Sequence, residues 1–536
     1  MSPEHGTKKN FALPLLFAIV MVMGIQIGYK MYDHLKMRGG FASLDVESAS
    51  TLEEVMRYID ARYVDTINRQ ELVREVIDGT LEKLDPHSSF IPADKLDSVN
   101  EQLEGNFEGI GIEFILFRDT LQVIAAISGG PSEKKGIQSG DKILTVNDTL
   151  IAGVGISSEE VISRLRGPKG TVVNLGILKE PGQIQNIIIT RDEIPLHSVD
   201  ICYKVNDNTG YIKISRFSAT TVDEFRKGLI KLKEMGINNL IIDLRDNPGG
   251  FLDAATEIAD ELLDKKRVLV YTQGKNFPRK EYYSRRPGLF EEGKVAVLIN
   301  QGSASASEIL AGAVQDWDRG HIIGRRSFGK GLVQEQYDLQ DGSALRLTVA
   351  RYFTPTGRCI QKPYNGQKKE KYDEDIYDRI EHGEYYTADS IKVNEDECFV
   401  TPSGKEVFGG GGISPDIFVP IDSTLDNSYI EIKNLVPEFL TDYFSSHRSK
   451  LFIAHPDYEK FAANYSGEEE YRAFRKFAEK THPEISSHQL DLLKKETYEL
   501  IKALLARLLW NDEGYFPLAN KNDPFILAAL KVFREK

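Results

Sequence analysis

The sequence predicts an α/β protein with a helical region at each end. Two observations carry this prediction. Short apolar runs of the kind found in buried parallel strands, at residues 239–244 and 295–300, are each followed by a helical pattern, and this alternation is typical of a layered α/β domain. Apolar residues also recur at helical spacing before about residue 104 and after about residue 423. At 536 residues the chain is long enough for several domains.

Composition excludes one class of partner. Hydrophobic residues make up 41% and charged residues 28% of the chain, both ordinary values for globular proteins. The net charge of -14 argues against a nucleic-acid partner, because binding to phosphates requires a basic surface. The cysteines Cys202, Cys359 and Cys398 are odd in number; a disulfide between the last two is open, and reduced thiols are expected. No Cys or His cluster has the spacing of a metal site.

Residues 11–29 form the one long apolar stretch of the sequence. Its length is just enough to span a bilayer once. A cleaved signal peptide is the alternative, but the stretch has no good Ala-x-Ala site and its second half is bulky, so an uncleaved signal anchor is expected. Basic residues lie on both sides, so charge orients the segment poorly.

Residues 46–104 predict a small helical packing module, since apolar residues recur there at helical spacing. The next segment, 105–194, alternates short strands with glycine turns and resembles a PDZ domain. Its carboxylate-binding loop matches Gly109, Ile110, Gly111 and Ile112. Such a loop offers backbone N–H groups to a terminal carboxylate while the peptide adds a strand to the sheet. The resemblance implies binding of free, apolar chain ends.

Serines 303, 305 and 307 follow the apolar strand 295–300, at the start of a predicted helix. Helical N–H groups that lack partners favour negative charge at such a turn. Lys330 lies between two glycines 25 residues after Ser305, and Gln334 follows at a spacing that shares one face of a strand. Burial can lower the pKa of a lysine far enough for it to act as the base for a serine. Taken alone, a serine at this position is usually a helix N-cap, and a lysine is usually a surface charge. Taken together, the serine, the lysine and the glutamine predict a serine–lysine hydrolase.

A glycine turn follows the strand 239–244. Gly249 and Gly250 let backbone N–H groups approach a ligand without a Cβ in the way. The alternative is a simple turn that binds nothing. A phosphate loop is disfavoured because the Lys-Ser/Thr ending of that motif is missing.

These motifs, in this order, resemble those of the carboxyl-terminal processing proteases, also called tail-specific proteases, of peptidase family S41. Runs at 84–88, 243–250, 352–358 and 410–416 match further motifs of the family. The resemblance implies that Ser305 is the nucleophile, a choice that spacing alone leaves open. It likewise implies that Lys330 is the general base, that Gln334 supports it, and that an oxyanion hole forms from the N–H groups of Ala306 and of Gly250 or Gly249.

The resemblance also implies a fold, a core like the spiral of ββα units in crotonase and Clp protease with the PDZ domain inserted. Arg166 is a candidate link between that domain and the active site. The polar insert 362–399 is expected to be a surface excursion, and the tail carries no recognisable chemistry. The expected domains are a cytoplasmic N-terminus (1–10), a transmembrane signal anchor (11–29), a helical module (46–104), a PDZ domain (105–194), a peptidase core (195–422) and a C-terminal helical region (423–536).

The predicted function is a serine endopeptidase that cleaves proteins near their C-termini after the PDZ domain has captured the tail. No metal, nucleotide or organic cofactor is expected. The predicted location is the inner (cytoplasmic) membrane, single-pass, with the catalytic body on the periplasmic side. Two alternatives are a crotonase-like acyl-thioester enzyme and a catalytically silent membrane-anchored PDZ scaffold or holdase. The PDZ resemblance and Lys330 argue against the first, and the complete Ser305, Lys330 and Gln334 set argues against the second.

Overall fold

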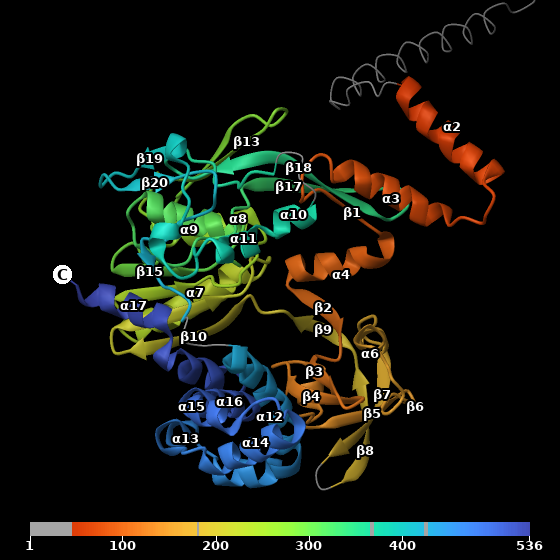
Figure 1. Cartoon of the computed structure of the whole chain (residues 1–536), viewed down its shortest axis with the longest axis vertical. Helices are drawn as coiled ribbons and strands as arrows, with labels where there is room; N and C mark the ends of the chain where they lie inside the picture. The colour runs from red at the N-terminus through yellow and green to blue at the C-terminus, as the bar shows by residue number, and fades with distance from the viewer. Residues whose placement is uncertain (1–45, 180–181, 365–368, 423–426, 536) are drawn as a thin grey trace, which may run out of the picture. The chain divides into compact units, whose positions relative to one another are not determined.

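The computed structural model describes residues 46–179, 182–364, 369–422 and 427–535. The chain divides into two compact units, Met1–Ile77 and Asp78–Lys536. In the first unit the structure describes α2 (Val46–Arg62) and the first part of α3 (Arg69–Leu81). The elements that follow belong to the second unit, and Figure 1 labels most of them along the chain.

A six-stranded sheet forms the centre of the second unit, in the order β10-β11-β12-β15-β16-β21. The first pair is antiparallel and all the other neighbours are parallel. Parallel strands covered on both faces need apolar residues throughout, which explains the two apolar runs in the sequence. The strands are β10 (Val199–Asn206), β11 (Thr209–Ile214), β12 (Asn239–Asp243), β15 (Lys294–Ile299), β16 (His321–Gly324) and β21 (Ile417–Phe418).

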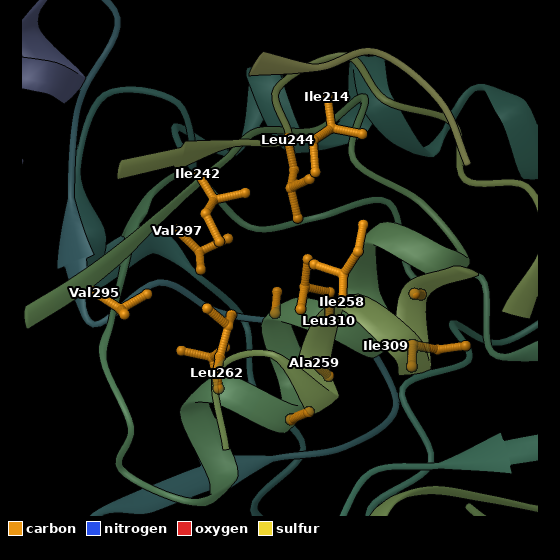
Figure 2. Packing of buried hydrophobic residues seen from close by; sticks show 14 of the residues in the cluster. Ile214, Ile242, Leu244, Ile258, Ala259, Leu262, Val295, Val297, Ile309 and Leu310 are labelled. Atoms are coloured by element: carbon orange, nitrogen blue, oxygen red, sulfur yellow. The ribbon is translucent and has the colours of Figure 1, made fainter. Parts of the chain in front are cut away.

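Helices cover both faces of this sheet. On one face, Ile242 and Val297 of the sheet pack with Ile258 and Leu310 of the helices, and all four side chains are fully buried. Figure 2 shows these residues gathered between the strands and the helix pair. On the other face, Phe525 belongs to a second buried cluster that includes sheet residues. The helices of the first face are α7 (Thr221–Glu234), α8 (Leu252–Asp260) and α9 (Ala306–Asp316), and that of the second is α17 (Pro524–Arg534).

A second sheet brings distant segments of the chain beside one another. Its long strand β18 pairs with β1, β13 and β17, and β14 pairs with β13. Because β1 follows residues 84–88 and β17 follows Lys330, the two runs meet at β18. The strands are β1 (Ser89–Ile91), β13 (Val268–Gln273), β14 (Lys280–Tyr283), β17 (Leu332–Asp338) and β18 (Ala344–Phe353).

The PDZ segment forms its own sheet, in the order β3-β4-β5-β7-β8, with β6 beside β5 and a separate β2–β9 pair. Its core is a cluster of buried Ile, Val and Leu side chains. The helix α4 (Ala93–Glu104) precedes it. Its elements are β2 (Asn106–Gly109), β3 (Ile112–Phe117), β4 (Thr120–Ala126), α5 (Pro131–Lys134), β5 (Lys142–Val146), β6 (Thr149–Leu150), α6 (Ser158–Leu165), β7 (Val172–Lys179), β8 (Gln183–Thr190) and β9 (Asp192–Pro195).

The C-terminal region is helical, as predicted, and contacts two other parts of the unit. Arg448 pairs at 2.8 Å with Asp141, a fully buried carboxylate of the PDZ segment. Asp523 pairs at 2.7 Å with Arg245 of the core. The tail therefore packs on both. Its helices are α12 (Asn427–Ala454), α13 (Tyr458–Asn464), α14 (Glu468–Thr481), α15 (Ser487–Leu492), α16 (Lys494–Ala519) and the 3-10 helix η3 (Asn520–Asn522).

The insert 362–399 differs in part from the predicted surface excursion. Most of its described residues are exposed or partly exposed, but Lys362, Tyr372 and Arg379 are buried. Polar residues tolerate burial when each finds a hydrogen-bond partner. The polar composition of the insert therefore did not indicate that these three side chains are buried. The described elements here are α10 (Lys369–Asp373), α11 (Asp375–Glu381), the 3-10 helices η1 (Ala388–Ser390) and η2 (Glu395–Glu397), and β19 (Cys398–Val400), which pairs with β20 (Glu406–Phe408).

The predicted location needs correction. Within the residues that the structure describes, no helix combines the length and the apolar character needed to cross a membrane. The stretch 11–29, on which the single-pass inner-membrane prediction depended, lies outside the described residues. The described part of the chain therefore does not support the predicted single-pass inner-membrane location. The three cysteines are free thiols.

The structure is thus a mixed α/β protein with a PDZ segment and a C-terminal helical region. The predicted helical module contains a short strand, β1, as well as helices. The spiral of ββα units and the domain boundaries stay predictions.

Candidate active site

Ser305 occupies the turn between β15 and α9, where it is the residue that precedes the first turn of the helix. Its backbone has φ 55° and ψ -113°, a left-handed conformation that side-chain-bearing residues rarely adopt. Its amide donates to Glu308 Oε2 at 2.8 Å. The fold therefore holds Ser305 in a conformation that it would not adopt alone.

Burial separates the three serines of the run. Ser303 is buried, and its hydroxyl donates to the Leu244 carbonyl at 2.8 Å. Ser307 is buried as well and donates to the Asn247 carbonyl at 2.9 Å. Ser305 alone of the three lines the large cavity described below. Its hydroxyl is therefore the one that a bound molecule can reach.

Lys330 lies immediately before β17. Its Nζ donates to Gln334 Oε1 at 2.9 Å, the hydrogen bond that the four-residue spacing predicts. Burial is the largest influence on this amine and lowers its pKa from the ordinary value, because the charged form loses hydration. Gln334 in turn donates from Nε2 to the His87 carbonyl at 2.5 Å. The Gln334 side-chain amide thus accepts from the Lys330 amine through its oxygen and is itself held through its nitrogen.

The glycine turn lies against Ser305. A Cβ on Gly249 would come within 2.7 Å of the Ser305 Cβ and 2.9 Å of the Ala306 amide nitrogen, so only glycine fits there. The Gly249 amide donates to Asn247 Oδ1 at 2.9 Å. In the described chain, the amides of Gly250 and Ala306 have no such partner. Of the two predicted glycines, Gly250 is therefore the one with a donor to offer.

These groups share one cavity of about 1140 Å³. Ser305, Lys330, Gln334, Gly249 and Gly250 all line it, so the structure brings the predicted core-site residues together. An extended peptide needs an apolar wall as well, and the cavity has one. That wall includes Leu103, Phe217, Val222, Phe251, Leu252, Ile309 and Leu332.

Comparison with known proteins decides the family. A model of peptidase family S41 matches residues 208–368, and a PDZ-domain model matches residues 122–179. A probable CtpA-like serine protease of Staphylococcus saprophyticus is 32% identical over 66% of this chain and 71% of its own length. The chain belongs to the carboxyl-terminal processing proteases of family S41. A family of unknown function matches residues 428–511, in the C-terminal helices.

A second curated relative agrees with this assignment. A carboxy-terminal-processing protease of Bartonella bacilliformis is 35% identical over 58% of this chain and 71% of its own length. Among solved structures, the photosystem II D1 C-terminal processing protease is 26% identical and covers 68% of this chain and 85% of that chain. Its TM-score is 0.35.

Glu308 is a residue of this S41 protease to which the sequence assigned no role. Its side chain is fully buried, and its two oxygens accept from the amides of Ser305, Gly329 and Lys330 and from the Ser327 hydroxyl. Burial raises the pKa of this carboxyl to about 7, against the lowering effect of those donors. One carboxylate thus ties together the backbones of both Ser305 and Lys330. An acidic residue in the first turn of a helix is so common that it gave no signal.

Replacing Glu308 by Gln should lower kcat about 100-fold and leave KM nearly unchanged. A carboxamide keeps the size but turns one acceptor into a donor, so two of the N–H or O–H groups lose their partner. Each unpaired buried donor costs about 1–3 kcal/mol, so the free energy of unfolding should fall too. The checks are steady-state kinetics and denaturant unfolding at pH 8. Ser327→Ala removes one of the four donors to Glu308 and the acceptor of the Ile413 amide, and it is the milder comparison at the active site. A Gln variant as active as wild type would contradict the role.

Two other residues were assigned no role by the sequence analysis, although both lie in runs that it singled out. His87 supplies the carbonyl that accepts from Gln334. Tyr352 is buried, and its hydroxyl lies within hydrogen-bond distance of the Ser305 and Lys330 carbonyls. The sequence motifs include these two residues, but only the tertiary contacts show which groups they bind.

The predicted peptide-binding loop has its carbonyls occupied from within the PDZ domain. The Ile110 carbonyl accepts from the Ser132 amide at 3.1 Å and hydroxyl at 2.6 Å, and the Gly111 carbonyl accepts from the Ile127 amide at 3.0 Å. Gly109 ends β2 and Ile112 begins β3. No hydrogen bond to the amides of Ile110 and Gly111 occurs within the described residues. Both residues are buried, and their contact with a terminal carboxylate stays a prediction.

Arg166 does not contact Ser305 or Lys330. Its guanidinium pairs with Glu101 of α4 and lies 4.6 Å from the centroid of the Phe107 ring. Gln102 and Leu103, the next residues of α4, line the catalytic cavity. The predicted link to the active site would therefore run through this helix, and it stays a prediction. In the described ranges, no group of three or more His, Cys, Asp and Glu residues is arranged to hold a metal ion.

Proposed function

We propose that this protease hydrolyses peptide bonds with Ser305 as nucleophile and Lys330 as general base, after its PDZ domain has bound the C-terminus of the substrate. The observation that carries the proposal is the shared cavity: Ser305 alone of the three serines lines it, together with a lysine that is partly buried and whose amine is hydrogen-bonded. We also propose the crotonase-like spiral for its core.

The proposed reaction uses only side chains and backbone of this chain. Neutral Lys330 accepts the Ser305 proton as the hydroxyl attacks the carbonyl carbon of the scissile bond. The amides of Ala306 and Gly250 donate to the oxyanion of the tetrahedral intermediate. Protonated Lys330 then returns the proton to the leaving amine, and water releases the acyl group by the reverse sequence. Gln334 keeps the amine directed toward the serine throughout.

The two alternative functions are less well supported. An acyl-thioester enzyme on the same kind of core has no use for a peptide-binding PDZ domain. A silent scaffold has no need of a buried lysine beside an accessible serine, because keeping a cation buried costs free energy. The protease accounts for both features with one activity.

Amidation of a substrate's C-terminus should lower kcat/KM by about 10-fold to 100-fold. The amides of Ile110 and Gly111 would lose a charged acceptor, and hydrogen bonds to charged groups contribute about 1.5–3 kcal/mol. The measurement compares peptides that differ only in ending as apolar carboxylate, apolar amide or Asp. The Ser305→Ala protein serves as the blank for contaminating proteases. Equal rates for the three peptides would mean that the PDZ domain does not bind chain ends.

A further inference from the structure

The insert places buried side chains against the base loop, by which we mean residues 327–331. Tyr372 of α10 is 2% exposed and Arg379 of α11 is 3% exposed. Buried polar groups of this size need hydrogen-bond partners, because an unpaired one is costly. Both side chains find them in the base loop or in residues that contact it.

Arg379 binds the chain just ahead of Lys330. Its Nη1 donates to the Ser327 carbonyl at 2.7 Å, and its Nη2 donates to the Phe328 carbonyl at 3.1 Å. Asp375 lies 2.9 Å from its Nε and supplies the opposite charge from the same helix. The planar fork of arginine holds two neighbouring carbonyls in one fixed geometry, which the flexible ammonium of a lysine does not reproduce. Arg379 therefore fixes the first half of the base loop.

The Tyr372 hydroxyl joins two chains of hydrogen bonds. Gln361 Nε2 donates to it at 3.0 Å, while Gln361 Oε1 accepts from the Gly331 amide at 2.8 Å. The hydroxyl also lies 3.1 Å from His87 Nε2, and the His87 carbonyl accepts from Gln334. Burial lowers the pKa of His87 to about 3, so its ring is neutral and Nε2 can accept. One hydroxyl thus supports both the end of the base loop and the amide beside it.

We propose that the insert is a positioning element for the base of this protease, and that Tyr372 and Arg379 are positioning residues that hold Lys330 and Gln334 in their working geometry. The inference rests on the proposed function of Ser305 and Lys330. Neither Tyr372 nor Arg379 lines the catalytic cavity, so neither touches the substrate. Both act through the base loop.

Holding the loop matters because Lys330 must remain buried to be neutral. Burial lowers the pKa of its amine; Arg346 and Lys369 lower it further, and Glu308 and Asp85 oppose them. Glycines flank the lysine on both sides, so the backbone itself offers little rigidity. A loosened loop would admit water to the amine, and its pKa would return toward the ordinary value. Activity would then require higher pH, a signature that a general loss of stability does not produce.

Tyr372→Phe is the first test, since it keeps the ring that packs against Phe328 and Lys362 and removes only the hydroxyl. We expect kcat to fall about 10-fold at neutral pH, KM to change little, and the acid limb of kcat/KM to move up by about one pH unit. Tyr385→Phe is the matched control. Tyr385 belongs to the same insert and is 4% exposed, and in the described chain its hydroxyl has no hydrogen-bond partner. That variant should match wild type.

Arg379→Lys is the second test, read by amide hydrogen exchange of residues 326–334 as well as by kinetics. Exchange should be faster in Tyr372→Phe and Arg379→Lys than in wild type or Tyr385→Phe. The inference would be overturned if folded Tyr372→Phe and Arg379→Lys both showed the hydrogen exchange and the pH profile of wild type. It would also be overturned if Tyr372→Phe and Tyr385→Phe lost equal amounts of activity. If Ser305→Ala hydrolyses peptides like wild type, the proposed function fails instead, and hydrogen exchange still decides whether the insert holds the loop.

Discussion

Ser305→Ala should reduce peptide hydrolysis by at least about 10⁴-fold without unfolding the protein. The variant has no nucleophile, and such a loss corresponds to more than about 5 kcal/mol of transition-state stabilisation. Alanine also lacks the side-chain oxygen but leaves the Glu308 contact to the backbone amide in place. The measurement is release of product from an unfolded protein substrate, with circular dichroism as the check on folding. Substantial turnover by the folded variant would exclude Ser305 as the nucleophile.

Ser303→Ala and Ser307→Ala are the matched controls for that experiment. Each removes a hydroxyl from the same run, but their hydroxyls donate to the Leu244 and Asn247 carbonyls and do not face the cavity. They should lower the free energy of unfolding by about 1 kcal/mol each and keep most of the activity. If either is as inactive as Ser305→Ala while still folded, the nucleophile has been misassigned.

Lys330→Arg should abolish activity nearly as completely, by about 10²-fold to 10⁴-fold in kcat. Arginine keeps a positive charge at the site but stays protonated at any working pH, so it cannot accept the serine proton. Lys330→Ala removes the amine altogether and should lose at least as much. Steady-state kinetics of the two variants at pH 8, set beside their thermal unfolding, are the measurement. Activity in the arginine variant would show that the base lies elsewhere.

The pH profile of the wild type belongs to the same test. The proposed role of Lys330 as the base requires that its proton is off, and the lowered pKa of the amine favours that form. The Glu308 carboxyl, with its pKa near 7, loses its proton in the same direction. Both effects make kcat/KM rise with pH through neutrality. His87, with a pKa of about 3, is already neutral there and adds no limb; a rate that falls as the pH passes 7 would contradict the assignment.

Much of the core was predictable because local pattern and tertiary role agree there. The apolar runs at 239–244 and 295–300 became β12 and β15 within a residue, since strands buried on both faces must be apolar throughout. The Lys330–Gln334 hydrogen bond is present as expected, but Lys330 lies before β17 and the ladder shifts register between Val333 and Gln334, so strand periodicity was the wrong reason for it. Family motifs located the cavity lining, and burial then distinguished Ser305 from its neighbours.

The rest depends on contacts between residues far apart in sequence. In the sequence, Glu308 is an ordinary acidic residue in the first turn of a helix. In the structure, the base loop packs against it and supplies three hydrogen-bond donors. Tyr372 and Arg379 sit in a polar stretch whose composition predicts exposure. They are buried because carbonyls and amides of the base loop and its neighbours satisfy them, and sequence pattern carries no information about those partners.

The backbone of Ser305 has a consequence for protein engineering. A side-chain-bearing residue in so unfavourable a conformation costs about 1–3 kcal/mol, which glycine would largely avoid. At this position the substitution that most improves heat resistance is therefore one that removes the hydroxyl. A screen of variants of this chain for melting temperature alone would therefore enrich inactive variants. Selection of a thermostable form has to include a measurement of turnover in every round.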